Sequence, residues 1–331
     1  MTELYRVGIV GFGQMGRNHA RVLQQMEFTQ LVVIVDPEFA KTNETWNSIP
    51  VISDISKLEG FDIDYCVVSA PTSLHSEICT HLLSRDVPMI IEKPLADSVE
   101  NAIKIQSAMK SHVPVAVGHI ENFNPAVIQA RSRILMGEIG KIHQISTSRI
   151  GPYPHRITDV GVIYDLASHD FGLTMFLTGE KYQTVSSTRK ILSNKKHEDV
   201  FISSGTLSGG SLYSHVVNWL SPIKERKIRI TGSLGLLEIN TLNSELILYK
   251  NGDSQILQRE LAHFQGVTQG DVISFAFEKQ EPLWNEHMSF INELNGLEST
   301  NVDLLMGLAI VKVADSMILS AETGQTLQMT R

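Results

Sequence analysis

YRVGIVGFGQMGRNHARVLQQMEFTQLVVIVD, from Tyr5 to Asp36, is the stretch that decides the fold of this 331-residue chain. It opens with a short apolar run of strand length, Val7 to Val10, and closes with a second one, Leu31 to Val35. Between them, apolar side chains recur at three- and four-residue steps from Gln14 to Gln25, which predicts a helix. A strand, a helix and a second strand in this order indicate a parallel α/β unit.

The turn between the first strand and the helix carries Gly11, Gly13 and Gly16 at G-x-G-x-x-G spacing. Gly11 permits the tight turn, Gly13 lets a pyrophosphate approach the backbone, and Gly16 lets the helix pack closely on the strand. The helix N-terminus presents free N–H groups to the phosphates. In this context the motif predicts a dinucleotide site, although a glycine-rich turn of another α/β protein remains an alternative. The predicted cofactor contacts in the turn are Gly11, Phe12, Gly13, Gln14, Met15 and Gly16.

An acidic residue, Asp36, ends the second strand, 20 residues after Gly16. A carboxylate at this place accepts hydrogen bonds from the ribose hydroxyls of an adenosine. Its charge would repel the 2′-phosphate of NADP, and no Arg or Lys follows before Lys41. We therefore expect NAD as the cofactor.

The alternation of strands and helices continues to about residue 120. Six predicted strands with intervening helices indicate a doubly wound parallel sheet with right-handed crossovers. Ligands of such sheets lie beyond the carboxyl ends of the strands, which marks residues 70–75, 92–94 and 118–124 as site loops. The cofactor contacts predicted from these loops are Ser69, Ala70, Pro71, Thr72, His75, Glu92, Lys93, Pro94 and Asn122.

The pattern changes after residue 120. Helices are predicted at 125–136 and 160–177, and then a series of short strands separated by turn signals runs from 183 to 249. Consecutive strands with short connections favour an antiparallel sheet, and two more helices close the chain. We expect an NAD-binding Rossmann domain at 1–120 and an α+β domain at 121–331.

Glu92-Lys93-Pro94 follows the fifth predicted strand, where a nicotinamide ring would lie. Lysine is uncommon at the edge of a buried sheet unless it is paired or functional. Lys93 could hold a substrate hydroxyl and stabilise an alkoxide. The alternative is an ordinary solvated lysine before a proline turn.

Asp165 and His169 lie four residues apart in an otherwise apolar predicted helix, GVIYDLASHDFGLTMFL. This spacing places both side chains on one helix face. An aspartate can orient and polarise a histidine so that the imidazole acts as a base. The alternative is a core histidine that is hydrogen-bonded to a neighbouring carboxylate. Asp170 is a weaker candidate because it points away from His169.

The loop before this helix, within SRIGPYPHRITDVG, holds Arg149, Tyr153 and Arg156. Arginines and a tyrosine on an irregular loop suit a diphosphate or a ring. A solvated surface loop is the alternative. The residues predicted to bind substrate are Lys93, Arg149, Tyr153, Arg156, Asp165 and His169.

Composition excludes several other classes. A net charge of −8 without a basic cluster argues against nucleic-acid binding. No apolar run reaches membrane-spanning length, and no signal peptide is recognised. Cys66 and Cys79 are expected to be reduced core residues of a cytoplasmic protein. No metal site is predicted, because Phe201 stands where an H-E-x-x-H pattern begun at His197 needs its second histidine.

Together these motifs resemble the glucose–fructose oxidoreductase, inositol dehydrogenase and MocA family over nearly the whole chain. The residues that carry the resemblance are the turn from Gly11 to Gly16, Asp36, Glu92-Lys93-Pro94 and the Asp165-x-x-x-His169 helix. The resemblance implies that Lys93 and His169 lie beside the nicotinamide and the reacting carbon. It also implies a Rossmann domain plus an α/β domain whose open, mainly antiparallel sheet often forms the contact of a homodimer or homotetramer.

Within that family, residues 118–127 and 149–170 resemble the UDP-N-acetylglucosamine 3-dehydrogenases, which use NAD to oxidise the sugar 3-hydroxyl. Asn122 and His155 depart from that subgroup's pattern, which bears on the exact nucleotide sugar and not on the reaction type. The sequence therefore indicates an NAD-dependent dehydrogenase for a hydroxyl of a UDP-sugar. Two alternative functions remain: an inositol or free-sugar dehydrogenase, and a non-catalytic NAD-binding regulator.

Overall fold

The structure is a computed structural model that describes residues 4–153, 160–192, 197–252 and 269–329. The chain forms two units. The first contains Met1–Ile120 and Glu281–Lys312, and the second contains Glu121–Gln280 and Val313–Arg331. Residues 281–312 thus pack with the first unit, whereas the sequence assigned everything after residue 120 to the second domain.

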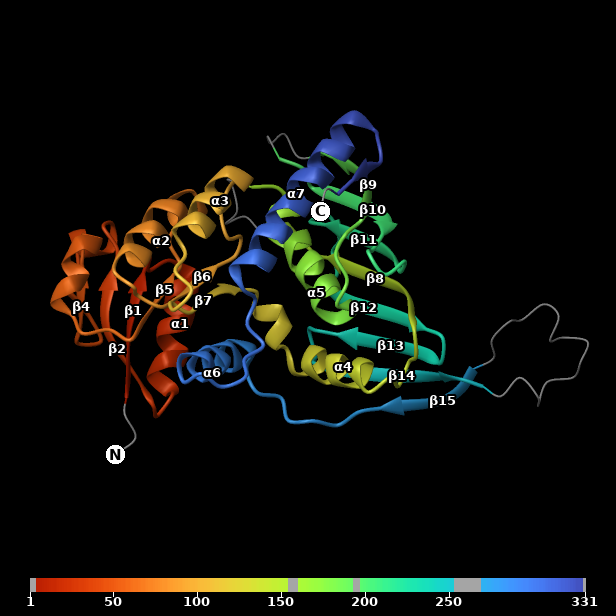
Figure 1. Ribbon diagram of the computed structural model, residues 1–331, viewed down its shortest axis with the longest axis horizontal. Coiled ribbons are helices and arrows are strands. Elements are labelled where there is room, and N and C mark those ends of the chain that lie inside the picture. Colours follow the sequence, from red (N-terminus) through yellow and green to blue (C-terminus); the bar gives the residue numbers. More distant parts are fainter. Residues whose placement is uncertain (1–3, 154–159, 193–196, 253–268, 330–331) are drawn as a thin grey trace, which may run out of the picture. The chain divides into compact units, whose positions relative to one another are not determined.

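A mostly parallel sheet forms the middle of the first unit (Figure 1). Its strands are β1 (Tyr5–Val10), β2 (Thr29–Val35), β3 (Thr45–Trp46), β4 (Ile49–Ile52), β5 (Tyr65–Val68), β6 (Met89–Glu92) and β7 (Val115–Gly118). Their order is β3-β4-β2-β1-β5-β6-β7. The predicted doubly wound parallel sheet is confirmed, with the short antiparallel β3 added at its edge.

Helices cover both faces of this sheet. They are α1 (Gln14–Gln25), α2 (His75–Ser84), α3 (Val99–Ala108), α6 (Pro282–Leu294) and the beginning of α7 (Leu304–Thr323), with short 3₁₀ turns η1 (Phe39–Lys41), η2 (Ile55–Gly60) and η3 (Thr72–Leu74). Because successive strand side chains point to opposite faces, each strand contributes to two cores. Val67 belongs to the core with α1 and α6, while Cys66 and Val68 belong to the core with α2, α3 and α7.

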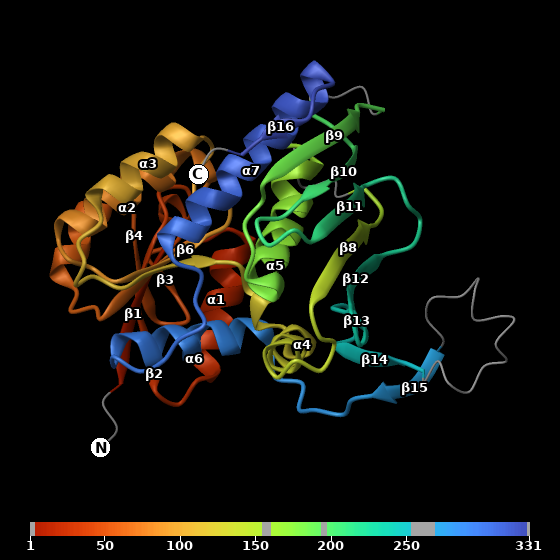
Figure 2. The ribbon, with the colours of Figure 1, turned by 45° about the vertical axis from the view of Figure 1, so that its right-hand side comes forward.

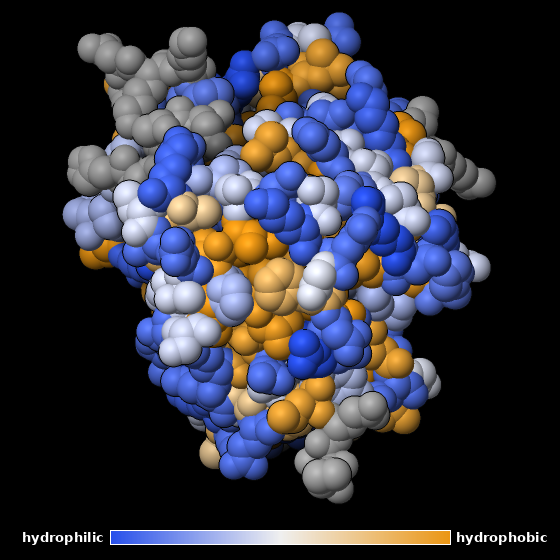
Figure 3. All heavy atoms as spheres, turned by 90° about the vertical axis from the view of Figure 1, so that its left-hand side faces the viewer, coloured by the Kyte–Doolittle hydropathy of each residue, from blue (hydrophilic) through white to orange (hydrophobic). Residues whose placement is uncertain are grey.

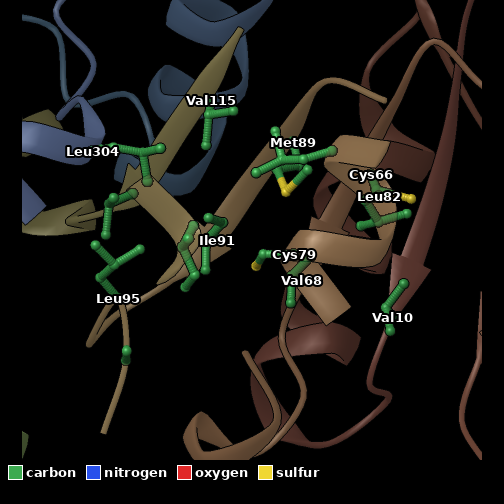
Figure 4. Close-up of a cluster of buried hydrophobic side chains, with 14 of the residues drawn as sticks. Val10, Cys66, Val68, Cys79, Leu82, Met89, Ile91, Leu95, Val115 and Leu304 are labelled. Atoms are coloured by element: carbon green, nitrogen blue, oxygen red, sulfur yellow. The ribbon is translucent and has the colours of Figure 1, made fainter. Parts of the chain in front are cut away.

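Figure 4 shows the second of these cores, where Cys66, Met89 and Ile91 from the strands lie near Cys79 and Leu82 from α2. Both cysteines are free and buried, as the sequence predicted. Burial raises the pKa of the Cys66 thiol to about 12, so this side chain packs as a small apolar group. Burial on both faces accounts for the nearly continuous apolar strands of this unit.

The second unit is built on a nine-stranded, mainly antiparallel sheet. Its strands are β8 (Ile142–Ile150), β9 (Thr184–Lys190), β10 (Val200–Thr206), β11 (Leu212–Asn218), β12 (Glu225–Gly232), β13 (Gly235–Asn240), β14 (Glu245–Asn251), β15 (Gln269–Ser274) and β16 (Leu327–Gln328). Their order is β15-β14-β13-β12-β8-β11-β10-β9-β16. The predicted antiparallel sheet is confirmed, apart from the parallel pair of β8 and β11.

Helices of the second unit lie against one face of its sheet (Figures 1 and 2). They are α4 (Pro125–Leu135), a π-helical turn (Ile163–Ala167), α5 (Ser168–Thr178) and the later part of α7, and the 3₁₀ turn η4 (Ile120–Phe123) joins the two units along the chain. Strand β12 shows the two faces, because Ile228 and Ile230 are buried whereas Arg229 between them is exposed. The opposite face is open and carries exposed apolar residues such as Ile202 and Leu212.

One helix of the described residues, α7, is long and apolar enough to cross a membrane by length and composition alone. Leu304, Leu308 and Val311 of this helix are buried in the core of the first unit, so we interpret α7 as a core helix. The face of the molecule in Figure 3 mixes hydrophilic residues with hydrophobic ones, which is ordinary for a folded protein surface.

Candidate active site

The turn between β1 and α1 can be formed only with glycine at two positions. Gly11 has φ +93°, and a Cβ atom there would lie 2.3 Å from the amide nitrogen of Ala70. A Cβ at Gly16 would lie 2.2 Å from the carbonyl oxygen of Gly11 and 2.9 Å from Ser69 Oγ. Ser69 Oγ in turn donates to the Gly11 carbonyl at 2.8 Å. Close backbone packing therefore fixes the turn against the loop that follows β5.

The third glycine faces open space. Gly13 is the N-cap of α1, and a Cβ there would meet no atom within 4 Å. The next residue, Gln14, is exposed, and Met15 is half-buried. Because the first N–H groups of a helix have no partner within it, this exposed helix start is a suitable anion site. The residues of the turn thus fit the pyrophosphate of a dinucleotide.

Asp36 holds the same turn from the end of β2. Its Oδ2 accepts a hydrogen bond from the Phe12 amide at 2.7 Å, and its Oδ1 accepts from the amides of Glu38 and Phe39 at 3.0 and 2.8 Å. The carboxylate is half-buried and lies where the sequence predicted a ribose contact. The sequence did not predict these hydrogen bonds, which order the turn itself.

The Phe12 side chain is covered by an aromatic cluster. It lies against the rings of Phe39 and Trp46, with centroid distances of 5.2 and 5.1 Å. The guanidinium of Arg17 lies 4.7 Å from the centroid of the Phe12 ring. A cation therefore stands close to the Asp36 turn, a feature that the search for basic residues after Asp36 missed.

His75 connects the loops that follow β5 and β6. It is buried, and its Nε2 lies 2.9 Å from the Ala70 carbonyl while its Nδ1 lies 3.1 Å from the Pro94 carbonyl. Pro71 and Thr72 lie in the loop that it braces. The His75 side chain thus links these two loops through hydrogen bonds to their carbonyl oxygens.

Glu92 and Lys93 follow in the chain at the end of β6, and the peptide bond from Lys93 to Pro94 is cis. Glu92 is buried, its Oε2 accepts from the Lys93 amide at 3.1 Å, and its Oε1 lies 2.9 Å from His19 Nε2. The Lys93 side chain is half-buried.

A buried polar network extends from Glu92 through the first unit. Nδ1 of His19 lies 3.0 Å from His287 Nε2, and the Tyr65 hydroxyl lies 3.0 Å from His287 Nδ1. The sequence did not predict a role for His19, His287 or Tyr65. A histidine among the apolar positions of a helix was the signal that could have pointed to this network.

His119, at the end of β7, is a further candidate near Lys93. It is buried, and its Nδ1 has no hydrogen-bond partner among the described residues. Burial and then the charge of Lys93 lower the pKa of His119 to about 4. The imidazole is therefore neutral near pH 7. The sequence predicted a site loop at residues 118–124 but gave no separate signal for His119.

In the second unit, the segment with Asp165 and His169 begins as a π-helical turn, not as the uninterrupted α-helix that the sequence predicted. The amide of Ile163 donates to Glu198 Oε1 at 3.1 Å, and a Cβ at Gly161 would lie 2.0 Å from the same oxygen. The buried Glu198 carboxylate thus closes the start of this segment. Wide turns of this kind are frequent at functional sites. Asp165 and His169 are both half-buried.

Arg149 on β8 is engaged by two carboxylates. Its Nε donates to Asp170 Oδ1 and its Nη1 to Glu121 Oε1, both at 2.8 Å, and the side chain is buried. Burial opposes the charge of the guanidinium, but the two carboxylates outweigh burial and raise the pKa of Arg149. The structure places Arg149 in a buried ion-pair network, which favours a structural role over the predicted contact with substrate.

The remaining predicted residues are placed as follows. The Tyr153 ring lies edge-on to Trp219, with a centroid distance of 5.5 Å. Asn122 is buried, and its Nδ2 has no hydrogen-bond partner among the described residues. Arg156 lies outside the residues that the structure describes.

Within the described part of the chain, no group of three or more His, Cys, Asp or Glu side chains is arranged to hold a metal ion.

Two family models match the chain. Residues 5–119 match the oxidoreductase family with an NAD-binding Rossmann fold, and residues 127–238 match the GFO/IDH/MocA C-terminal domain. The chain belongs to the Gfo/Idh/MocA oxidoreductase family. Its first unit is the NAD-binding Rossmann domain of that family, and the glycine turn described above is the part of that domain that fits the cofactor.

Among members of this family, an inositol 2-dehydrogenase of Arthrobacter is 28% identical over 193 residues, or 56% of this chain and 57% of that protein. A UDP-N-acetylglucosamine 3-dehydrogenase of Acidithiobacillus ferrooxidans is 26% identical over 253 residues, or 75% of this chain and 77% of that protein. The match thus spans little more than half the length of the Arthrobacter enzyme.

Solved structures show the same fold. The Acidithiobacillus enzyme superimposes with a TM-score of 0.81 at 22% identity, covering 96% of this chain and 98% of that one. A levoglucosan dehydrogenase in complex with NADH superimposes with a TM-score of 0.85 at 18% identity, covering 99% of this chain and 100% of that one.

Proposed function

We propose that this Gfo/Idh/MocA protein oxidises a hydroxyl of a nucleotide sugar with NAD, and that the hydroxyl is the 3-hydroxyl of UDP-N-acetylglucosamine. The observation that carries the proposal is the extent of the match to the Acidithiobacillus enzyme, which covers 75% of this chain. The matched stretch of 253 residues is much longer than the first unit, so it must include a large part of the second unit. A match confined to the cofactor-binding unit would say little about the substrate.

The proposed chemistry needs a proton acceptor and a stabiliser of negative charge. The hydroxyl proton leaves to His169, which Asp165 orients, and Lys93 stabilises the developing alkoxide. When bound, NAD supplies the acceptor for the hydride that leaves the same carbon. A ketone remains on the sugar, so one hydride and one proton account for the oxidation.

The second unit supplies the proposed substrate contacts. We assign binding roles to Tyr153 and Arg156 on the loop that follows β8, as the sequence predicted. Arg149 supports this region through its ion pairs with Glu121 and Asp170. The open face of the sheet is the proposed contact of a homodimer or homotetramer, and we propose a cytoplasmic location.

An inositol or free-sugar dehydrogenase is the second candidate. It is favoured by the 28% identity to the Arthrobacter inositol 2-dehydrogenase, although that match covers only 56% of this chain. A non-catalytic regulator is disfavoured because Lys93, Asp165 and His169 are all present.

The test is a direct comparison of substrates. We expect the purified protein to form NADH from NAD with UDP-N-acetylglucosamine and not with myo-inositol. UMP and the UDP-sugar should also raise its melting temperature, because a ligand of the folded state stabilises it. NADH formation with myo-inositol alone, without thermal stabilisation by UMP, would contradict the proposed substrate.

A further inference from the structure

Two arginines lie side by side on neighbouring strands of the second unit. In the antiparallel pairing of β12 with β8, Arg226 is the partner of Arg149. Directly opposed residues of such a pair have their side chains on the same face of the sheet. The buried neighbours Thr147 and Ile228 show that this is the face covered by the helices. Arg229, three residues along β12, lies on the open face and pairs with Glu238 there.

The two arginines differ in their partners. Arg149 is paired with Glu121 and Asp170, as described above. Arg226 makes no ion pair with any described residue, and it uses one nitrogen only: its Nη1 donates to the carbonyl oxygens of Ile150 and Glu225, both at 2.8 Å. A guanidinium has five N–H donors. The edge formed by Nε and Nη2 therefore has three donors that no described residue accepts.

Burial and several charged neighbours act on the Arg226 guanidinium. The side chain is half-buried, and burial, followed by the charge of Arg149, lowers the pKa of Arg226 to about 10. The charges of Glu121, Asp170 and Asp165 act in the opposite direction. However, the first two carboxylates are held by Arg149 through directed hydrogen bonds. Glu121 and Asp170 balance the charges of Arg149 and Arg226, so the free edge of Arg226 lacks hydrogen-bond acceptors and not charge, and the oxygens of a phosphate would supply such acceptors.

The position of the Arg226 guanidinium is also informative. Arg226 Nη1 lies 3.9 Å from the place where a Cβ of Gly151 would be, so the guanidinium lies against the first residue after β8. This is the start of the loop to which the sequence assigned substrate binding. The same side chain holds the end of β8 through the Ile150 carbonyl. The guanidinium of Arg226 therefore lies beside the start of this loop.

We propose that Arg226 binds the diphosphate of the substrate through its Nε and Nη2 donors and thereby selects nucleotide sugars over neutral sugars and polyols. A guanidinium edge matches a phosphate with two parallel hydrogen bonds, which a lysine ammonium cannot reproduce. The inference rests on the proposed function, because it takes the anion to be that of a nucleotide sugar. The inference assigns the diphosphate to Arg226 instead of Arg149, because Arg149 already pairs with Glu121 and Asp170.

The experiment measures UDP binding to the NAD-loaded protein by calorimetry for the parent, Arg226→Gln, Arg226→Lys and the control Arg229→Gln. We expect Arg226→Gln to weaken UDP binding roughly ten- to hundredfold, as for the loss of a hydrogen-bonded charged group. Arg226→Lys should also bind UDP more weakly than the parent. Arg229→Gln removes an equal charge from the open face of the same strand and should bind UDP like the parent.

Turnover gives a second readout. With UDP-N-acetylglucosamine, Arg226→Gln should raise KM more than it lowers kcat, because the diphosphate contact is made in both the ground state and the transition state. Melting temperatures of all variants check folding. If Arg226→Gln does not fold, the comparison of Arg226→Lys with the parent decides, since lysine keeps the charge and a donor for the strand carbonyls.

The possible failures are distinguishable. UDP binding that is equal in the parent and both Arg226 variants would overturn this inference and leave the proposed function intact. A parent that binds no uridine nucleotide and forms NADH only with myo-inositol would overturn both.

Discussion

The glycine turn of the first unit and Arg226 of the second unit are both proposed to hold phosphate groups, but by different means. The turn uses backbone N–H groups at the start of α1, and its shape is set by glycines whose added Cβ atoms would lie within 2.3 Å of other backbone atoms. The arginine pair uses side chains whose roles depend on residues far away in the sequence. Arg149 and Arg226 are 77 positions apart, and the contacts of each decide which one is neutralised.

The difference shows why the role of a motif can be inferred from one protein to another more safely than the role of a single charged side chain. A glycine turn carries its own geometry, since the residues that need the close approach lie within or beside the motif. A charged side chain has no fixed role until its partners are known.

The largest effect is expected from breaking the Arg149 network. Arg149→Met leaves the carboxylates of Glu121 and Asp170 without their cation, and we expect it to lower the free energy of unfolding by about 3–5 kcal/mol. Arg229→Met breaks an exposed pair with Glu238 and should cost at most about 1 kcal/mol. Urea unfolding of both variants measures the difference. Similar small losses in both would show that Arg149 is not structural and would restore it as a substrate ligand.

The second effect concerns turnover. His169→Ala and Lys93→Met should each lower kcat by about a hundredfold or more, if general base catalysis and charge stabilisation are lost. NAD affinity, measured by fluorescence titration, should change little. The double variant should lose much less than the product of the two single losses, because groups that act as a unit are not additive. Near-normal turnover in His169→Ala would leave Lys93 as the base.

The third prediction compares the effects of substituting two glycines of the turn, Gly11 and Gly13. Gly11→Ala introduces a Cβ that would lie 2.3 Å from the Ala70 nitrogen, and we expect it to lower the free energy of unfolding by about 1–3 kcal/mol or more. Gly13→Ala meets no atom within 4 Å and should cost at most about 1 kcal/mol as an altered N-cap. Its methyl group should nevertheless weaken NAD binding. Unchanged NAD affinity in a folded Gly13→Ala protein would place the pyrophosphate elsewhere.

The smallest effect concerns the choice between NAD and NADP. We expect the parent to prefer NAD clearly, and Asp36→Asn to narrow that preference by removing the charge that repels a 2′-phosphate. Asparagine keeps one acceptor oxygen for the amides that Asp36 holds, and Arg17 nearby supplies a cation that favours the phosphate. The measurement is kcat/KM with each cofactor. Equal efficiency of the parent with both would refute the role of Asp36.

Much of the fold could be predicted because local patterns determine it. Helix α1 has the predicted bounds, since the glycine turn marks its start and apolar periodicity marks its length. The two-residue strands β3 and β16 were missed, because too few residues pair for a pattern to emerge. Strand β15 was missed because none of its residues is fully buried, so its sequence lacks a clear apolar alternation. The π-helical turn was also missed, since the spacing of apolar residues that predicts a helix does not distinguish one wide turn within it.

The site could be predicted only in part. The glycines and Asp36 lie where the motif requires them, because their geometry is local. The ion pairs of Arg149 could not be predicted, since its partners Glu121 and Asp170 lie 28 and 21 residues away. Arg226 was not considered at all, because nothing in its own stretch of sequence distinguishes it from Arg229.

The most direct measurement of the proposed function follows one hydrogen atom. UDP-N-acetylglucosamine carrying deuterium at C3 is incubated with the protein and unlabelled NAD, and the reduced cofactor is analysed by mass spectrometry and NMR. We predict that the deuterium appears on C4 of the nicotinamide and that a 3-keto UDP-sugar forms in equal amount. Reduced cofactor without deuterium, or a reaction only with sugars or polyols that carry no nucleotide, would contradict the proposed reaction.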